Sequence, residues 1–212
     1  INILPIKTKA DFGQFLKVTD AVYDKSDNWV KPLNIEKTMA FSKKQPIFDH
    51  LVWSGWVGYI NEVPCGRITA QIDELYIAKD NFRTGFIGFF ESTNDKLLIE
   101  RLFSTAETWL KKRGIKKVLG PLSFNINQEV GLLIEGFETT PFVMMPNGKR
   151  YYQNAFENNE YVKTIDLFSF NIQANFKPPR LMQKLLAKLP SDLHVRPINK
   201  KKLEQELNIL CQ

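Results

Sequence analysis

The sequence has few of the residue types that build disulfide frameworks or metal sites. It contains two cysteines, Cys65 and Cys211, and two histidines, His50 and His194, and none of them stands in a ligand-spaced cluster. Disulfide scaffolds and zinc sites need several such residues at short spacings. The sequence therefore predicts no metal site and no disulfide framework, and a reducing cytoplasm is the expected location.

Long hydrophobic runs are also missing. No apolar segment approaches the about 20 residues that a membrane-spanning helix needs, and the first residues show no signal-peptide pattern. We expect no membrane partner. The chain begins at Ile1 rather than methionine and stops at Gln212 inside a helical pattern, so it is expected to be part of a longer product.

Charge of one sign is not concentrated along most of the chain. The formal net charge is +6, from 29 basic and 23 acidic residues, and the two signs are interspersed. A nucleic-acid-binding module would gather its lysines on one face and bind in a strongly salt-dependent way. We keep that class only as a third hypothesis, because a solvated basic surface explains the charge. The hydrophobic fraction of 43% is enough for a substantial core.

Hydrophobic periodicity predicts a sheet in the first part of the chain. Residues 51–60 and 64–73 alternate as an antiparallel hairpin, and residues 85–91 read as a further strand of the same sheet. A long amphipathic helix follows, with Thr93 as the expected N-cap and Gly114 as the expected C-terminal cap. Its predicted sheet-facing side chains are Leu98, Leu102, Ala106 and Trp109.

The second half of the chain divides into shorter predicted elements. We expect a strand at 115–124, a short helix at 129–137, another helix at 148–162 and a final strand at 163–172. Residues 173–180, rich in proline, read as a linker. Residues 181–212 are predicted to start a second, truncated copy, because "HVRPINKK" echoes "NILPIKTK" near the start. A domain at 1–172 would then precede the linker.

Several segments together resemble one protein family. They include "VPCGRITA", "GFIGFFES", "AETWLKKRG", "VLGPLSFNIN", "GLLIEGF" and "YYQNAFENNEY". With the order of predicted elements, they are similar to a bacterial group of tandem GNAT-like proteins, within the GCN5-related N-acetyltransferase (GNAT) superfamily. The resemblance covers about residues 1–171. It implies an α/β GNAT fold, with a mixed, mostly antiparallel sheet flanked by helices, and a second GNAT-like domain as an intramolecular partner.

The resemblance also implies a site for acetyl-CoA at one turn between strand and helix. In the superfamily, backbone N–H groups of a glycine-rich loop hold the pyrophosphate at the helix N-terminus. The loop here has no glycine and carries two acids, which repel a diphosphate. Thr93 and Asp95 could simply cap the helix, or a shortened loop could use its backbone amides. The candidate cofactor-binding residues are Phe89, Phe90, Glu91, Ser92, Thr93, Asn94, Asp95 and Lys96.

A second departure concerns the acid that protonates the leaving thiolate. Many members carry a tyrosine at the position that Phe156 holds here, and phenylalanine cannot donate a proton. Tyr151 or Tyr152 could replace it, or the pair could serve as core and rim. Transfer also needs a base and an oxyanion donor. Glu91 and Glu129 are the candidate bases, so the predicted catalytic residues are Glu129, Glu91 and Tyr152.

Polar residues after the Gly-Pro break are the candidate substrate-binding group. They are Asn125, Asn127 and Gln128, joined by Arg67, a charge in mid-strand that must be paired or solvated. The amides could instead satisfy the backbone of their own loop. Amines, amino acids, peptides and aminoglycosides all remain compatible acceptors.

The resemblance implies an acyl-CoA-dependent N-acyltransferase that transfers an acetyl group directly to a small-molecule amine. The alternative is a non-catalytic GNAT-like half that binds a ligand or docks on a second GNAT domain. The two differ in one structural feature. An enzyme must leave the gap between the strands at 85–91 and 115–124 open, whereas a docking half could fill it with Phe89, Phe90 or Leu122.

Overall fold

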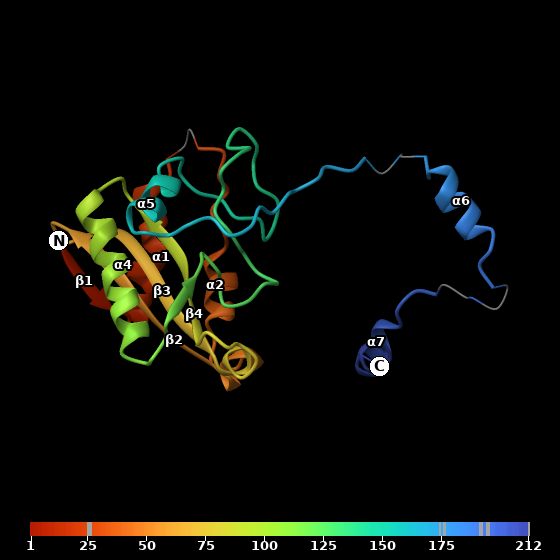
Figure 1. The fold of residues 1–212 in the computed structure, drawn as a ribbon, viewed down its shortest axis with the longest axis horizontal. Coiled ribbons are helices and arrows are strands. Elements are labelled where there is room, and N and C mark those ends of the chain that lie inside the picture. The colour runs from red at the N-terminus through yellow and green to blue at the C-terminus, as the bar shows by residue number, and fades with distance from the viewer. Residues whose placement is uncertain (25–26, 174, 176, 191–192, 194–195, 212) are drawn as a thin grey trace. The chain divides into compact units, whose positions relative to one another are not determined.

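A computed structural model describes residues 1–24, 27–173, 175, 177–190, 193 and 196–211 (Figure 1). The chain divides into two units, Ile1–Leu167 and Phe168–Gln212. We describe each unit by itself. The predicted boundary between a first domain, a linker and a second copy stays a prediction.

The first unit is built on one five-stranded sheet. Its strands lie in the order of the chain: β1 (Asn2–Pro5), β2 (Leu51–Ile60), β3 (Val63–Asp73), β4 (Thr84–Ser92) and β5 (Lys117–Leu119). Strands β1 to β4 pair antiparallel, and β5 joins β4 in parallel. The predicted hairpin is confirmed, and so is the mixed, mostly antiparallel sheet.

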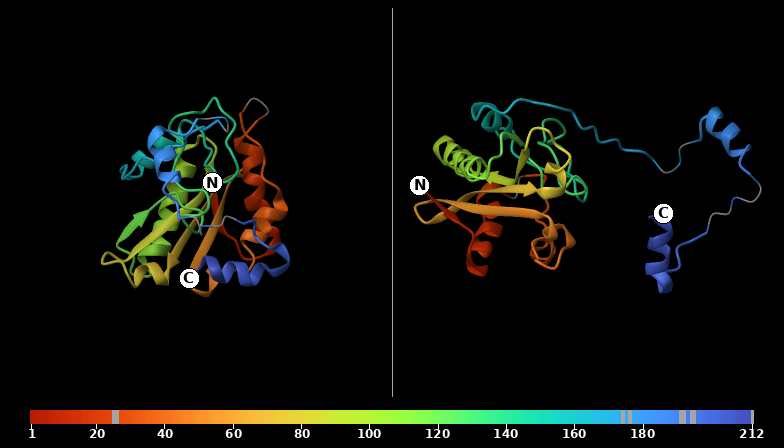
Figure 2. Two further views of the ribbon diagram at one scale, coloured as in Figure 1. Left: turned by 90° about the vertical axis from the view of Figure 1, so that its right-hand side faces the viewer. Right: turned by 60° about the horizontal axis from the view of Figure 1, so that its bottom comes forward.

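Two helices cover the two faces of this sheet, and Figure 2 shows the sheet between them. Alternate residues of a strand point to opposite faces, so Phe89 packs on Phe15 of α1 while Phe90 packs on Phe103 of α4. These rings and their neighbours form one buried hydrophobic core. The helical elements of this unit are α1 (Lys9–Val22), α2 (Asn34–Ala40), η1 (Pro46–Asp49), α3 (Glu74–Ile77), α4 (Lys96–Lys111) and α5 (Tyr152–Asn158).

The ends of α4 correct one prediction and confirm another. The N-cap is Asp95, whose carboxylate accepts from the N–H of Leu98 at 2.8 Å. Thr93 is not the cap, because its own N–H donates to the carbonyl of Cys65 on β3, at 2.8 Å, and holds the residue in the sheet. Gly114 does end the helix. It has φ +77, and the following N–H reaches back to the carbonyl of Leu110 at 3.2 Å.

The two candidate caps can be separated by mutation. Asp95→Ala is expected to lower the free energy of unfolding by about 1 kcal/mol, since it leaves an N-terminal amide of α4 without its acceptor. Thr93→Ala is the matched control, and its effect should be clearly smaller because the Thr93 side chain does not cap the helix. Chemical denaturation measures both. A larger loss for Thr93→Ala would contradict the cap assignment.

Four predicted elements differ from the structure. Residues 129–137 form no helix, and residues 163–172 form no strand. The strand predicted at 115–124 is reduced to β5, and Gly120 and Pro121 follow it directly. Proline cannot donate to a ladder, so the pairing ends there. The helix predicted at 148–162 is reduced to α5.

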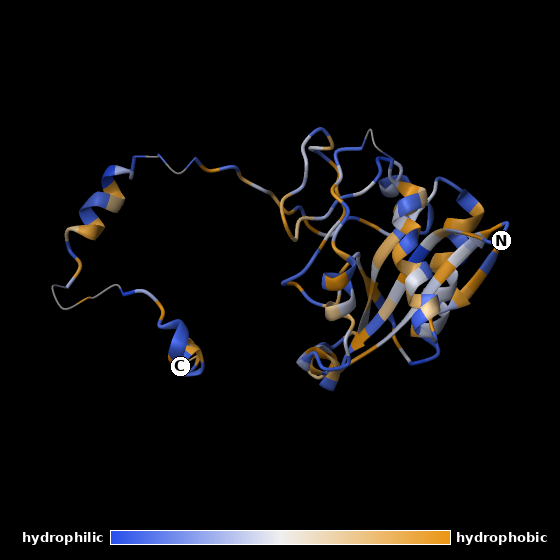
Figure 3. Ribbon diagram, turned by 180° about the vertical axis from the view of Figure 1, so that it is seen from behind, coloured by the Kyte–Doolittle hydropathy of each residue, from blue (hydrophilic) through white to orange (hydrophobic). Residues whose placement is uncertain are grey.

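The second unit contains α6 (Arg180–Leu186), η2 (Lys200–Lys202) and α7 (Leu203–Leu210). Both α-helices carry hydrophobic and hydrophilic residues along their length (Figure 3). In the part of this unit that the structure describes, no residue is buried. The strand predicted around "LHVRPI" includes positions 194 and 195, which lie outside the described residues.

Candidate active site

The site begins where β4 loses its neighbour on one side. Pairing with β5 covers Thr84 to Phe86, and one more bond runs from the N–H of Leu122 to the carbonyl of Ile87, at 2.8 Å. Beyond it, β4 is bulged: the register against β3 shifts, and Phe89 has φ +48. A bulge re-aims the side chains that follow it. Residues 90–92 therefore continue along β3 without β5 beside them.

Two tyrosines from the start of α5 cover the exposed edge at this point. The N–H of Ser92 donates to the hydroxyl of Tyr152 at 3.0 Å, and the hydroxyl of Tyr151 donates to the carbonyl of Ser92 at 2.7 Å. The N–H of the next residue, Thr93, bonds to β3. The backbone N–H and carbonyl of Ser92 therefore point away from β3. The use of the gap between β4 and β5, for a ligand or for docking, stays a prediction. Tyrosine hydroxyls cap its edge.

Glu91 is the chemical centre of this region. Tyr152 donates its hydroxyl to the Glu91 carboxylate at 2.7 Å, and Arg67, the cross-strand partner on β3, places a guanidinium nitrogen 3.8 Å from the other carboxylate oxygen. Burial raises the pKa of Glu91 above its ordinary value, and Arg67 and Tyr152 oppose that rise. A buried carboxylate with a raised pKa beside a hydroxyl is a candidate for proton transfer.

The raised pKa predicts a pH dependence of stability. Well below pH 4.5, the ordinary pKa of glutamate, Glu91 is protonated in both the folded and the unfolded protein. As the pH rises above 4.5, Glu91 ionises first in the unfolded chain. Its contribution to stability is therefore lost as the pH rises. We expect the free energy of unfolding of the wild type, minus that of Glu91→Gln, to fall as the pH rises above about 4.5. Urea denaturation of both proteins measures this, and a difference that grows with pH would contradict it.

Arg67 faces the protein interior. Its guanidinium lies 4.9 Å from the ring centroid of Phe15 and donates to the Phe15 carbonyl at 3.2 Å. Its Nε has no hydrogen-bond partner among the described residues. A buried guanidinium must be paired, and Glu91 supplies the charge. Arg67 is thus placed to hold Glu91, and its predicted contact with substrate stays a prediction.

Tyr23, at the end of α1, was not singled out by the sequence. Its hydroxyl is buried and has no hydrogen-bond partner among the described residues. Burial and the charge of Glu91 raise the pKa of Tyr23, and burial, Glu91 and Asp27 raise the pKa of Tyr151 to about 12. Tyr23 follows the apolar spacing of its helix, so only the tertiary structure shows it beside a carboxylate.

The remaining predicted polar residues stand further from this centre. Glu129 forms an ion pair with Lys37 of α2 at 2.8 Å, and its charge still adds to the raised pKa of Glu91. Asn125 accepts from the N–H of Asn127 at 2.8 Å, and the N–H of Gln128 donates to the Asn125 carbonyl at 3.2 Å. These contacts agree with the alternative in which this segment satisfies the hydrogen bonds of its own loop. A role of the amides in binding substrate stays a prediction.

The turn before α4 has most of its groups engaged within itself. The N–H of Asp95 and the hydroxyl of Ser92 both donate to the Thr93 carbonyl, at 2.7 and 2.9 Å. Asn94 and Lys96 are exposed, and Lys96 lies 3.8 Å from Glu100 one turn along the helix. The amide of Asp95 is thus occupied. Binding of coenzyme A at this turn stays a prediction.

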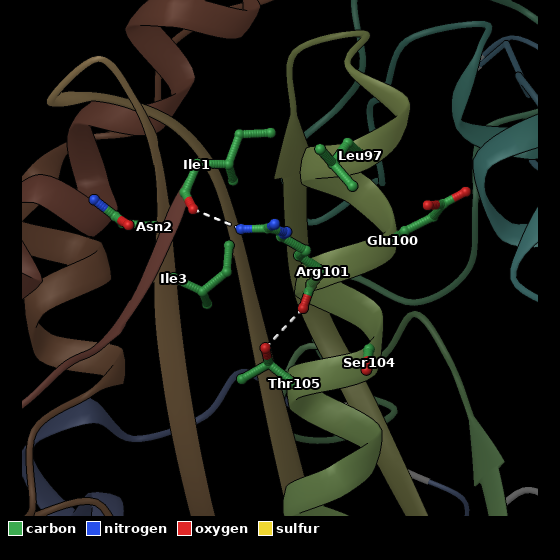
Figure 4. Close-up of a pocket in the computed structure, with 8 residues that line it drawn as sticks. All are labelled: Ile1, Asn2, Ile3, Leu97, Glu100, Arg101, Ser104 and Thr105. Atoms are coloured by element: carbon green, nitrogen blue, oxygen red, sulfur yellow. Dashed lines mark hydrogen bonds between the residues drawn. The ribbon is translucent and has the colours of Figure 1, made fainter.

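Two cavities stand out among the described residues of the first unit, and neither has Glu91 in its lining. The larger, of about 500 Å³, lies between β1 and α4 (Figure 4); Arg101 donates there to the Ile1 carbonyl at 2.7 Å. It contains none of the predicted site residues. The smaller, of about 360 Å³, includes Tyr23 and Tyr151 in its lining. We call it the Tyr23 cavity. The remaining lining residues are Asp27, Asn28, Phe137, Glu138, Asn147, Gly148, Lys149 and Arg150.

The described residues also bear on metal sites and on membrane-spanning helices. Among the described residues, no group of three or more histidine, cysteine, aspartate or glutamate side chains is arranged to hold a metal ion. Over the same residues, no helix combines the length and the apolar character needed to cross a bilayer.

The topology decides the fold. The first unit has four antiparallel strands, a bulge in the fourth, a long helix after it and a fifth strand parallel to the fourth. The family resemblance implied this kind of mixed, mostly antiparallel sheet flanked by helices. The chain has the GNAT fold. It departs from the expected order at its end, where the final strand is not formed at residues 163–172.

Two curated proteins are similar in sequence. Protein YghO of Escherichia coli (strain K12) is 39% identical over 205 residues, covering 95% of this chain and 52% of that protein. A protein named bacterial ceramide synthase, from Caulobacter vibrioides (strain NA1000 / CB15N), is 32% identical over 215 residues, covering 100% of this chain and 56% of that protein. The chain thus spans about half the length of the curated relatives it matches. No family model matches the chain.

One solved structure illustrates the similarity in three dimensions. The aminoglycoside 6'-N-acetyltransferase AAC(6')-IG from Acinetobacter haemolyticus superposes with a TM-score of 0.47 at 11% identity, over 82% of this chain and 100% of that one. The assignment of this GNAT fold rests on the strand order and the bulge of β4.

Proposed function

We propose that this chain is the GNAT half of an acyl-CoA-dependent N-acyltransferase that acts by direct transfer to an amine. One observation carries the proposal: the buried Glu91 carboxylate, bonded to Tyr152, lies where β5 leaves the bulged β4. In the superfamily this gap receives the pantetheine arm. A base and an acid are therefore held together at the point where a thioester would arrive.

The proposed chemistry uses the bond between Glu91 and Tyr152. The acceptor ammonium loses a proton to Glu91, and its nitrogen attacks the thioester carbonyl. The C–N bond forms, the C–S bond breaks, Tyr152 gives its proton to the departing thiolate, and the new amide nitrogen releases its surplus proton to solvent. Burial and the Glu91 charge raise the pKa of Tyr152, and the effect of the charge ends when Glu91 becomes protonated. Tyr152 is then the stronger acid at the moment when it must donate, and Glu91 returns the proton.

The acceptor class is suggested by one relative. A ceramide is the amide of a long-chain amino alcohol with a fatty acid, so the name bacterial ceramide synthase describes an N-acyl transfer. We therefore propose a long-chain amine as the acceptor class and a fatty acyl-CoA beside acetyl-CoA as the donor class. The basic surface of this chain does not select among donors, since every acyl-CoA carries the same phosphates.

A second candidate function is a non-catalytic half that docks on another domain. The capped edge of β4 favours it, because Tyr151 and Tyr152 occupy the backbone groups of Ser92 that face the gap. In that case the tyrosines serve as permanent partners of the strand. In the catalytic case they must move, or the donor must bind beside them.

Calorimetric titration of acetyl-CoA and of a fatty acyl-CoA into the purified chain tests the proposal, with desulfo-coenzyme A and ATP as controls. If the diphosphate binds at the N-terminus of α4, Asn94→Glu should weaken binding about fivefold through charge repulsion. Ser104→Glu adds the same charge on an exposed face further along α4 and should leave binding unchanged. Absence of heat with every thioester would reject the catalytic reading for this chain and favour the docking half.

A further inference from the structure

The Tyr23 cavity contains a ready-made position for a cation. Lys149 places its ammonium 2.7 Å from both carboxylate oxygens of Asp27 and 5.3 Å from the ring centroid of Tyr23. That ring is stacked on Trp29, with the centroids 4.3 Å apart. A carboxylate combined with an aromatic face is the arrangement that recognises ammonium groups. The protein's own lysine occupies it in this structure.

The position is sheltered and lies next to the proposed catalytic centre. The Asp27 and Lys149 side chains are 23% and 21% exposed, so the pair is screened less than a surface ion pair. Tyr151 lines the cavity while its hydroxyl bonds to Ser92, the neighbour of Glu91. Both Asp27 and Glu91 raise the pKa of Tyr151, which shows that one side chain senses both carboxylates.

The loop that joins two walls of the cavity is apolar and exposed. The cavity is lined by residues 137–138 and 147–151, and the connecting segment carries Phe142, Val143 and Met144. Phe142 is 75% exposed and Val143 93%. Single exposed apolar residues are common, but consecutive ones beside a polar cavity mark a binding surface. On the other wall, the chain after Asn28 carries Val30, which is exposed as well.

We propose that the Tyr23 cavity binds the polar head of an amphiphilic primary amine, and that its hydrocarbon chain lies along Phe142–Met144. The ligand ammonium replaces that of Lys149 between Asp27 and the Tyr23 ring. Lys149 thus acts as a tethered competitor that keeps the site paired until the ligand arrives. A cavity of about 360 Å³ is too small for a long chain and suits a head group, which leaves the chain to the apolar loop. This inference rests on the proposed function, because it places the acceptor of that reaction.

The test measures binding without an acyl donor. A series of 2-amino-1-alkanols from butyl to decyl is titrated calorimetrically into the purified chain, with the 1-alkanols as controls without an amine. We expect affinity to rise about two- to fourfold for each added methylene. Phe142→Ser combined with Val143→Ser should flatten this rise. Ile126→Ser, at an equally exposed site on another loop, should leave it intact.

The ion pair is tested by two variants with opposite expected effects. Asp27→Asn should weaken binding of every amine about tenfold, because the carboxylate that receives the ammonium is gone. Lys149→Met should tighten binding about fivefold, because the competing ammonium is removed. If the pair only ties two loops together, both variants will weaken binding alike, and the proposal is overturned. An unchanged chain-length slope in the Phe142 and Val143 variant overturns the placement of the chain.

The two proposals can fail separately. Amine binding with these responses but without acyl transfer would support the site and reject the activity. Acyl transfer whose KM for the amine does not respond to Asp27→Asn or Lys149→Met would support the activity and reject this site.

Discussion

Glu91→Gln is expected to reduce the rate of acyl transfer by two to four orders of magnitude, about the contribution of a positioned general base. Glutamine has nearly the same shape and keeps an acceptor for the Tyr152 hydroxyl, which now lies 2.7 Å from the carboxylate. It cannot take a proton from the ammonium, and it cannot reprotonate Tyr152. Both halves of the proposed proton path are lost by one substitution. A coupled assay of free coenzyme A measures the rate.

The matched control is Glu100→Gln on α4. Glu100 is exposed and its nearest cation, Lys96, is 3.8 Å away, so activity and stability should both be retained. Glu91→Gln also leaves Arg67 without its charge partner, so unfolding must be followed alongside activity. A folded Glu91→Gln protein with wild-type activity would refute the role of Glu91. Glutamine at a residue that is only structural would lower stability and leave the turnover of the folded fraction unchanged.

Gly88→Ala is expected to have the largest effect on stability, about 3 kcal/mol or more. A Cβ at this position would lie 1.9 Å from the carbonyl oxygen of Leu122 and 2.7 Å from its carbonyl carbon. These are backbone atoms, so no side-chain rotation relieves the clash. The segment after β5 would have to move away from β4, and with it the bond between Leu122 and Ile87. Urea denaturation measures the loss.

Gly13→Ala provides the contrast for this substitution. Gly13 lies inside α1, and a Cβ there would meet no atom within 4 Å. Alanine is the better helix former, so this variant should be more stable by about 0.5–1 kcal/mol. The same chemical change thus has opposite expected signs at two positions. Equal effects at both would show that β4 and the chain at Leu122 are not packed as described.

The helix α4 shows what local pattern can and cannot predict. Its apolar spacing and Gly114 were enough to predict the helix and its C-terminal end, because both depend on residues within a few positions of each other. The N-cap was predicted two residues too early. Thr93 and Asp95 both have side chains that cap helices, and only the pairing of Thr93 with Cys65 on β3 decides between them.

In the region after β5, local sequence pattern did not predict the structure. Apolar residues at 129–137 and 163–172 have helical and strand-like spacing, yet neither segment forms the element, so the spacing alone did not decide their structure. The side-chain amide of Asn125 looked site-like in sequence, and its oxygen accepts from the backbone N–H of Asn127 in the same loop. Asparagine serves ligands and turns with the same group, and sequence does not separate the two uses.

The sequence by itself determined the hairpin of β2 and β3, the long helix after β4 and the choice of Glu91, because alternation, amphipathic spacing and a charge beside an apolar strand are local properties. The role of Glu91 as a base stays a prediction, and only the tertiary structure decided which groups surround that charge. Arg67 reaches Glu91 through strand pairing, Tyr152 reaches it from a helix 61 residues further along the chain, and Tyr23 from the end of α1. A carboxylate's pKa and partners depend on burial and on neighbours distant in sequence, which no local pattern contains.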